Sequence, residues 1–329
     1  VNADMWMFYT EGAAGKIRLD VADIAGTGSY VIHEAAPSMF ADEQTKSFES
    51  YDDAAIVTIA RSGSESADVP TIYDDSYAQP MDVEGFVGAF HSEPVDSPDD
   101  IGRHYLELTA TEEELLSYVS SQFDNVIVLI NSGNAMDLSF LNKEEYGVDA
   151  CLWIGNPGQD GLYAVGDLLN GTANPSGKTV DTYAYDPTGA PAAVNFGDFR
   201  MENADDAIHN AYVVYQEGIY VGYRYYETRY EDCILGAGNA ASAAGVTADG
   251  ADEWVYADEV QFPFGYGLSY TEFEKELVSS SIEDGKFVFE VKVTNTGSVE
   301  GKEVVQVYVQ NPYTEYDKAN GIEKSAVQL

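Results

Sequence analysis

The chain is 329 residues long, and its 57 acidic residues against 16 basic ones give a formal net charge of −41. Such a charge repels phosphate backbones and anionic headgroups, which argues against nucleic acid and membrane surfaces as partners. No apolar run approaches the ~18–20 residues that a membrane span requires. An apolar fraction of 45% is typical of a globular protein with a substantial core.

Cysteine and histidine residues form no motif that would hold a metal or act in redox chemistry. The two cysteines, Cys151 and Cys233, have no C-x-x-C partner, and the four histidines are scattered along the chain. No stretch matches a calcium-binding loop of the D-x-[DN]-x-[DN]-G type. We therefore expect no metal site, and we expect no organic cofactor either.

The first confident element is a continuous apolar run at residues 54–60, β-branched at four consecutive positions. A run of this kind predicts a strand of a parallel sheet that is buried on both faces. The small, polar stretch at residues 61–70 follows it and contains Gly63, Arg61 and Glu65. Because open α/β sheets bind ligands at the carboxyl ends of their strands, this loop is a candidate site.

Strands and helices then alternate. Thr109 and the acidic residues after it predict the start of a helix that ends near Phe123. Trp153, which lies within an apolar run, is assigned to the core. The pattern predicts strands at residues 125–131, 148–155 and 179–183, and helices at residues 135–141 and 162–169. Repeated strand–helix–strand units predict an α/β fold with a mostly parallel sheet between layers of helices.

From about Thr271 the pattern becomes all-β. Residues 286–294 alternate, which places Phe287, Phe289, Val291 and Val293 on one face. Residues 303–310 predict the next strand. An immunoglobulin-like sandwich needs ~100 residues, and fewer than 60 remain here. We therefore expect an α/β domain at residues 1–271 and part of an immunoglobulin or fibronectin type III-like β-sandwich at residues 272–329.

Most catalytic motifs are absent from the sequence. It contains no G-x-S-x-G elbow, no H-E-x-x-H helix and no Walker loop. Residues 131–134 follow a strand but lack the glycine spacing of a nucleotide-binding loop, and the net charge also disfavours a nucleotide. Carboxylate chemistry remains, since glycoside hydrolysis needs two carboxyl groups. Glu65 fits the acid of such a pair, although its position alone favours a solvated loop residue.

A family resemblance separates these two interpretations. Residues 61–68, Arg-Ser-Gly-Ser-Glu-Ser-Ala-Asp, resemble the acid/base segment in the C-terminal α/β-sandwich domain of glycoside hydrolase family 3. Further landmarks of that family follow in the same order at residues 129–133, 153–161, 168–178, 217–227 and 262–270. Residues 293–308 look like the start of the family's fibronectin type III-like domain. The resemblance extends over residues 54–329, and several motifs in a fixed order make it specific.

The resemblance implies a retaining, exo-acting β-glycosidase of the β-glucosidase or β-xylosidase type. Glu65 would be its general acid/base, and Arg61 and Asp68 would bind substrate or position the loop. The family's nucleophile is an aspartate on a separate (β/α)8 barrel, which this chain lacks. The implied partners are that barrel and an oligosaccharide or β-glycoside substrate, and the isolated chain is expected to be inactive. The alternative is a non-catalytic carbohydrate-binding or scaffolding module of the same fold.

Overall fold

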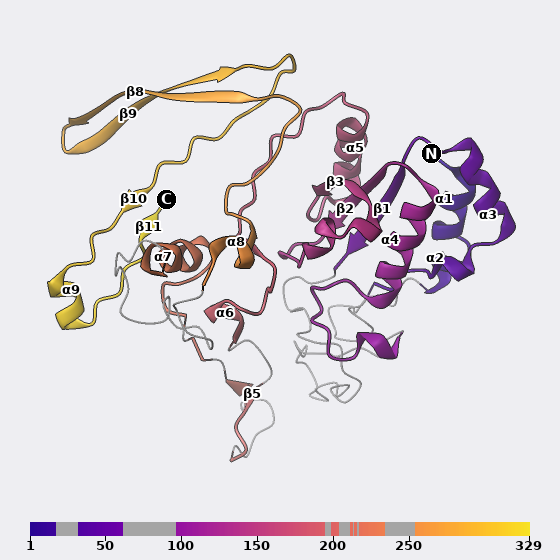
Figure 1. Cartoon of the computed structure of the whole chain (residues 1–329), viewed down its shortest axis with the longest axis horizontal. Helices are drawn as coiled ribbons and strands as arrows, with labels where there is room; N and C mark the ends of the chain where they lie inside the picture. The colour runs from indigo at the N-terminus through magenta and orange to yellow at the C-terminus, as the bar shows by residue number, and fades with distance from the viewer. Residues whose placement is uncertain are drawn as a thin grey trace. The chain divides into compact units, whose positions relative to one another are not determined.

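In the computed structural model, drawn in Figure 1, the chain folds into two compact units. The first comprises residues 1–156 and 185–216, and the second comprises residues 157–184 and 217–329. The structure describes residues 1–17, 32–61, 97–194, 199–203, 211–212, 214–215, 217–233 and 254–329. Residues 271 and 272, between which we expect the domain boundary, lie in the same unit. The domain boundary stays a prediction.

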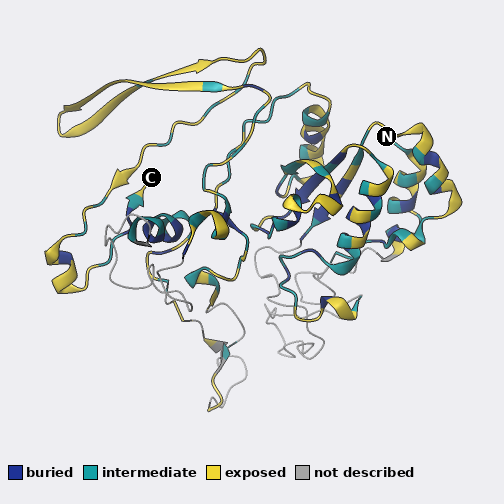
Figure 2. Ribbon diagram, viewed as in Figure 1, coloured by how far each residue is buried: buried dark blue, intermediate teal, exposed yellow. Residues whose placement is uncertain are grey.

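A parallel sheet forms the centre of the first unit. Its strands are β1 (Ala55–Ala60), β2 (Val126–Asn131) and β3 (Val148–Trp153), in the order β1-β2-β3. β2 is buried along most of its length, as expected for a central strand (Figure 2). In β1 only alternate residues are buried, and Ile56 is 52% exposed. The prediction of a strand buried on both faces is therefore wrong for β1, which has a neighbour on one side only among the described residues.

Helix α4 (Ala110–Gln122) connects β1 to β2 and packs against β1. It begins with a capping box, in which Thr109 and Glu112 each accept a hydrogen bond from the other's backbone N–H. Its apolar face, with Leu115 and Leu116, is buried. Aromatic contacts join α4 to the N-terminal segment, where the ring centroids of Tyr118 and Phe40 lie 5.7 Å apart.

The remaining α-helices and strands described in the first unit are short. They are α1 (Ala3–Thr10), α2 (Ala13–Ile17), α3 (Asp42–Ser47), α6 (Pro191–Val194), and the antiparallel pair β5 (Phe199–Arg200) and β6 (Ala211–Tyr212). The helix predicted at residues 135–141 is wrong, because only a 3-10 turn, η5 (Ser139–Asn142), is found there. The Asp137 carboxylate accepts a hydrogen bond from the backbone N–H of Ser139, and this local turn replaces the helix.

The second unit contains the other helices and several two-stranded sheets. Its elements before the C-terminal hairpin are α5 (Gly158–Leu169), β4 (Tyr183–Ala184), α7 (Tyr223–Cys233), α8 (Tyr256–Glu259) and β7 (Val260–Phe262). β4 pairs with β7 in antiparallel orientation. Of the strand predicted at residues 179–183, only Tyr183 is found in a strand. At the other end of that range, the backbone of Thr179 forms hydrogen bonds with the turn at Gly265 and Tyr266.

A long β-hairpin follows, made of β8 (Phe273–Glu283) and β9 (Lys286–Asn295). Asp284 and Gly285 form its two-residue turn, and both have the positive φ that a type I′ turn requires. The alternation predicted for residues 286–294 is confirmed, since the rings of Phe287 and Phe289 stack on one face. The pairing register adds Leu277 and Ile282 to this face.

The chain ends with β10 (Val309–Gln310), α9 (Glu315–Asn320) and β11 (Val327–Gln328). β10 pairs with β11, so the strand predicted at residues 303–310 is confirmed for its last two residues only. The predicted fold class is confirmed, because a parallel α/β sheet is followed by antiparallel β structure. Within the described ranges, no helix is long and apolar enough to cross a membrane.

The apolar face of the hairpin leads to a testable prediction. Phe287 is 73% exposed, and the hairpin is exposed along almost its whole length (Figure 2). Replacing Phe287 and Phe289 together by serine should lower the binding of the dye ANS by this chain, because exposed apolar patches bind such dyes. The free energy of unfolding should change by less than about 0.5 kcal/mol, as is usual at exposed positions. Val288→Ser alters the opposite face and serves as the control, and equal loss of dye binding in both variants would contradict the prediction.

Candidate active-site edge of the parallel sheet

The carboxyl ends of β1, β2 and β3 meet at one edge of the sheet, which is where such sheets bind ligands. Arg61 follows β1 directly, Asn131 ends β2, and Gly155 lies just after β3. The loop that carries Glu65 therefore begins at this edge. Glu65 and Asp68 themselves lie outside the described residues.

Arg61 is buried, with a relative exposure of 5%. Its Nε donates to the carbonyl oxygen of Tyr105 at 2.7 Å, and Nη1 donates to that of Ala60 at 2.8 Å. Nη1 and Nη2 each donate to one carboxylate oxygen of Glu112, both at 2.8 Å. Nη2 also donates to the carbonyl oxygen of Glu107. A guanidinium has five N–H donors, so this network occupies all of them and favours loop positioning over direct contact with a substrate.

Glu112 is also buried, and its carboxylate accepts hydrogen bonds from two different residues. Besides Arg61, its Oε2 accepts a hydrogen bond from the backbone N–H of Thr109 at 2.8 Å. The carboxylate that closes the capping box of α4 is therefore the carboxylate that holds Arg61. Sequence analysis did not identify Glu112, although the spacing Thr-x-x-Glu at the start of α4 marked it as a capping residue.

The loops after the three strands are cross-linked to one another. The backbone N–H of Arg61 donates to the carbonyl oxygen of Asn131 at 3.1 Å. The Asn131 side chain donates to the carbonyl oxygen of Gly155 at 2.5 Å. Trp153 donates through Nε1 to the carbonyl oxygen of Ser132 at 2.8 Å, and Ser132 bonds to the backbone of Asn134. These bonds give the edge a defined backbone conformation.

Trp153 is a correction to the sequence analysis. The apolar run around it predicted a core residue, but its side chain is 42% exposed. It is the last residue of β3, an outer strand of the described sheet, so its indole extends to the carboxyl edge. There its N–H stabilises the loop after β2.

Titratable side chains that sequence analysis did not identify lie near the start of α4 and after β2. The Nδ1 of His104 accepts a hydrogen bond from the backbone N–H of Leu106 at 3.1 Å. Burial lowers the pKa of His104, although the nearby carboxylates of Glu107 and Asp186 act in the opposite direction. The lowered pKa keeps the imidazole neutral at pH 7. Burial also raises the pKa of Asp137, and the charge of Glu107 adds to that effect.

The described residues contain no group of three or more histidine, cysteine, aspartate or glutamate side chains that could hold a metal ion. Cys151 is a free thiol on β3. Burial raises its pKa to about 12, and such a thiol remains protonated, and hence a poor nucleophile, at neutral pH.

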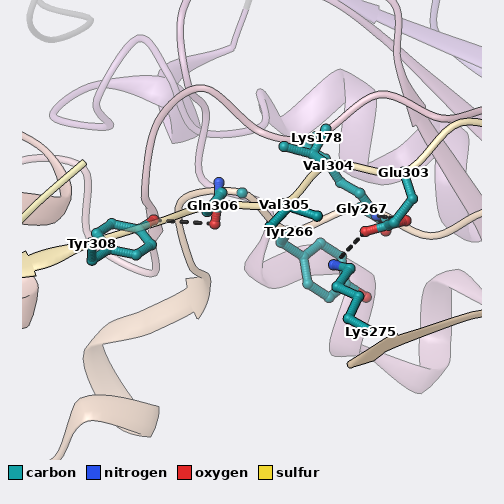
Figure 3. A pocket seen from close by; sticks show the side chains of 10 residues that line it. Lys178, Tyr266, Gly267, Lys275, Glu303, Val304, Val305, Gln306 and Tyr308 are labelled. Carbon is teal, nitrogen blue, oxygen red and sulfur yellow. Dashed lines mark hydrogen bonds and ion pairs between the residues drawn. The ribbon is translucent and has the colours of Figure 1, made fainter. Parts of the chain in front are cut away.

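The second unit has a pocket of about 400 Å³ (Figure 3). Its polar centre is the Glu303 carboxylate, whose Oε1 lies 2.6 Å from Nζ of Lys275 and whose Oε2 lies 3.5 Å from Nζ of Lys178. The hydrogen bond from Lys275 lowers the pKa of Glu303. Lys178 also donates to the carbonyl oxygen of Gly267 at 2.6 Å. This network connects the aromatic turn near Tyr266 to the first strand of the hairpin. Its role is therefore structural.

Comparison with known proteins assigns the family. The model of the glycosyl hydrolase family 3 C-terminal domain matches residues 29–223, more than half of the chain. The chain belongs to glycosyl hydrolase family 3. The family resemblance inferred from the motifs at residues 61–68 and beyond is therefore confirmed.

Several family 3 relatives are known β-glucosidases. The β-glucosidase of Ruminococcus albus is 36% identical over 225 residues, which are 67% of this chain and 19% of that protein. β-Glucosidase A of Butyrivibrio fibrisolvens is 35% identical over 228 residues, which are 65% of this chain and 23% of that protein. The chain thus spans less than a quarter of these relatives.

Solved structures of the family match the fold. β-Glucosidase 3B of Thermotoga neapolitana superposes with a TM-score of 0.60 and 25% identity, covering 99% of this chain and 36% of that one. A β-glucosidase of Paenibacillus barengoltzii gives a TM-score of 0.59 and 28% identity, covering 91% of this chain and 25% of that one. The fold described above is therefore that of the corresponding part of family 3 enzymes.

Proposed function

We propose that this chain is the acid/base-bearing part of a retaining, exo-acting β-glycosidase of the β-glucosidase or β-xylosidase type. Glu65 supplies the general acid/base to an active site shared with a (β/α)8 barrel, and the barrel supplies the nucleophilic aspartate. The observation that carries the proposal is the attachment of the Glu65 loop. The loop leaves β1 at Arg61, at the carboxyl edge of a parallel sheet in a family 3 chain.

In the first step, the anomeric carbon of the sugar forms a bond to the barrel's aspartate while its bond to the glycosidic oxygen breaks. The Glu65 carboxyl group protonates that oxygen, and the aglycone leaves as a neutral alcohol. In the second step, the Glu65 carboxylate takes a proton from water, the water oxygen bonds to the anomeric carbon, and the aspartate is released. Two inversions retain the β configuration.

Arg61 and Asp68 have supporting roles in this proposal. Arg61 holds the start of the loop through the five hydrogen bonds that its guanidinium donates within the protein. Asp68, three residues after Glu65, assists at the rim of the sugar site or positions the loop. The substrate is a terminal β-linked sugar, and no step requires a metal or an organic cofactor.

The test compares the isolated chain with the same chain joined to its barrel domain. With 4-nitrophenyl β-glucoside and β-xyloside as substrates, the joined protein should turn over, because it holds both carboxyl groups. The isolated chain should release no more nitrophenol than the buffer blank. Turnover by the isolated chain would contradict the proposal, and so would a full-length protein that binds sugars without hydrolysing them. The second result would favour the carbohydrate-binding module.

A further inference from the structure

The residue at which the Glu65 loop begins, Arg61, is held by its side chain, and a residue of another element determines the orientation of that side chain. Arg61 is the last residue before the loop and lies four positions before Glu65. The guanidinium of Arg61 lies 5.6 Å from the centroid of the Tyr105 ring. It also bonds to backbone carbonyl oxygens on the segment before α4. The backbone at residue 61 is thereby fixed against that segment.

Glu112 determines the orientation of this guanidinium. The pair is bidentate, with both nitrogen–oxygen distances at 2.8 Å, and its side chains are 2% and 4% exposed. A bidentate arginine–carboxylate pair fixes the plane of the guanidinium as well as its position. A rotated guanidinium could not reach the carbonyl oxygens of Tyr105, Ala60 and Glu107 at the same time.

Glu112 is in turn held by the first turn of α4. Its carboxylate accepts the N–H of Thr109, and its own N–H donates to the Thr109 hydroxyl. The helix N-terminus also favours a negative charge at this position. A continuous set of contacts therefore runs from the rigid first turn of α4 through Glu112 and Arg61 to the start of the loop.

We propose that Glu112 is a positioning residue for the acid/base Glu65, acting through the bidentate pair with Arg61. The inference rests on the proposed function. It adds a buried residue that lies 51 positions after Arg61 and would act through Arg61. Loss of the pair moves the start of the loop, and with it the carboxyl group that protonates the leaving oxygen.

The neighbouring residue Glu113 provides a matched control. It lies on the same turn of α4 and carries the same charge, but it pairs with Arg103 at 2.9 Å and with Lys143 at 3.5 Å. Its side chain is 27% exposed. Glu113→Gln removes one charge from the same helix end and leaves the pair between Arg61 and Glu112 in place.

The test measures kcat and KM of the full-length enzyme on two β-glucosides. An alkyl glucoside has a poor leaving group and needs the acid, whereas a dinitrophenyl glucoside does not. Glu112→Gln should lower kcat/KM on the alkyl glucoside about 10–100-fold, since a displacement of ~1 Å costs on the order of 10²-fold. The loss of kcat/KM on the dinitrophenyl glucoside should be much smaller, because kcat/KM reports formation of the glycosyl–enzyme, which needs no acid with that substrate. Glu113→Gln should retain both activities. If Glu112→Gln does not fold, Glu112→Asp, which keeps the charge but shortens the side chain, tests the same prediction.

Glu65→Ala in the same assay separates the two levels of the proposal. If Glu65→Ala shows the leaving-group dependence and folded Glu112→Gln does not, Glu112 is not a positioning residue and the proposed function stands. Equal losses of kcat/KM on both substrates in Glu112→Gln would also overturn the inference, because a general loss of folded protein produces that result. If Glu65→Ala itself has no selective effect, the proposed function fails, and this inference fails with it.

Discussion

Replacing Glu65 by alanine in the full-length enzyme is expected to lower kcat on β-glycosides with poor leaving groups by about 10²–10⁴-fold, which is the usual contribution of a general acid/base. An alkyl alcohol cannot leave as its anion, so it needs the proton that Glu65 supplies. Dinitrophenolate leaves without a proton, so formation of the glycosyl–enzyme should be nearly unaffected with that substrate. Hydrolysis of the glycosyl–enzyme should become rate-limiting, because water then lacks its general base.

Azide provides the diagnostic measurement for Glu65→Ala. As an anion it attacks the glycosyl–enzyme without a general base, so it should restore turnover of the dinitrophenyl glycoside and give a β-glycosyl azide. Glu114→Ala, which replaces an exposed acid on α4, is the control. Its turnover of both glycosides should match that of the parent enzyme, with and without azide. Unchanged turnover of the alkyl glycoside by Glu65→Ala would show that another group is the acid.

The parallel sheet could be predicted because its signal is local. The mainly apolar runs of β1, β2 and β3, of which the first two are rich in β-branched residues, each form the strand that they indicate. The alternation on β9 is likewise read from neighbouring residues, but the hairpin was not predicted, because the Asp284-Gly285 turn and β8 were not identified from the sequence. A strand also needs an edge to pair with, however. Residues 303–308 belong to a predicted strand as well, but pairing is found only at Val309 and Gln310.

The contacts of the candidate site could not be predicted because they join residues far apart in sequence. Three consecutive acids, Glu112, Glu113 and Glu114, open α4, and composition does not distinguish them. In the structure, the first is buried against Arg61, the second pairs with Arg103, and the third is exposed. The helical rotation of about 100° per residue assigns these different surroundings. Only the packing of α4 beside β1 shows which acid reaches the loop.

The buried pair leads to a second prediction, on stability. Arg61→Leu alone should lower the free energy of unfolding by about 3–5 kcal/mol, because it leaves the Glu112 carboxylate buried without its cation. Glu112→Leu should have a similar effect for the opposite reason. Urea unfolding followed by far-UV circular dichroism measures both, with the denaturant slope checked for each variant.

The double variant Arg61→Leu/Glu112→Leu is the decisive measurement. It removes both buried charges, so it should cost less than the sum of the single variants by about 2 kcal/mol, within the range found for coupled neighbours. It should not return to the stability of the parent chain, because the carbonyl oxygens of Tyr105, Ala60 and Glu107 lose their donor. The same cycle on Arg103 and Glu113, whose side chains are 26% and 27% exposed, should give less than about 1 kcal/mol. If the coupling energy of the Arg61–Glu112 pair were no larger than that of the Arg103–Glu113 pair, Glu112 would not hold Arg61 as the geometry indicates, and its effect on Glu65 would need another cause.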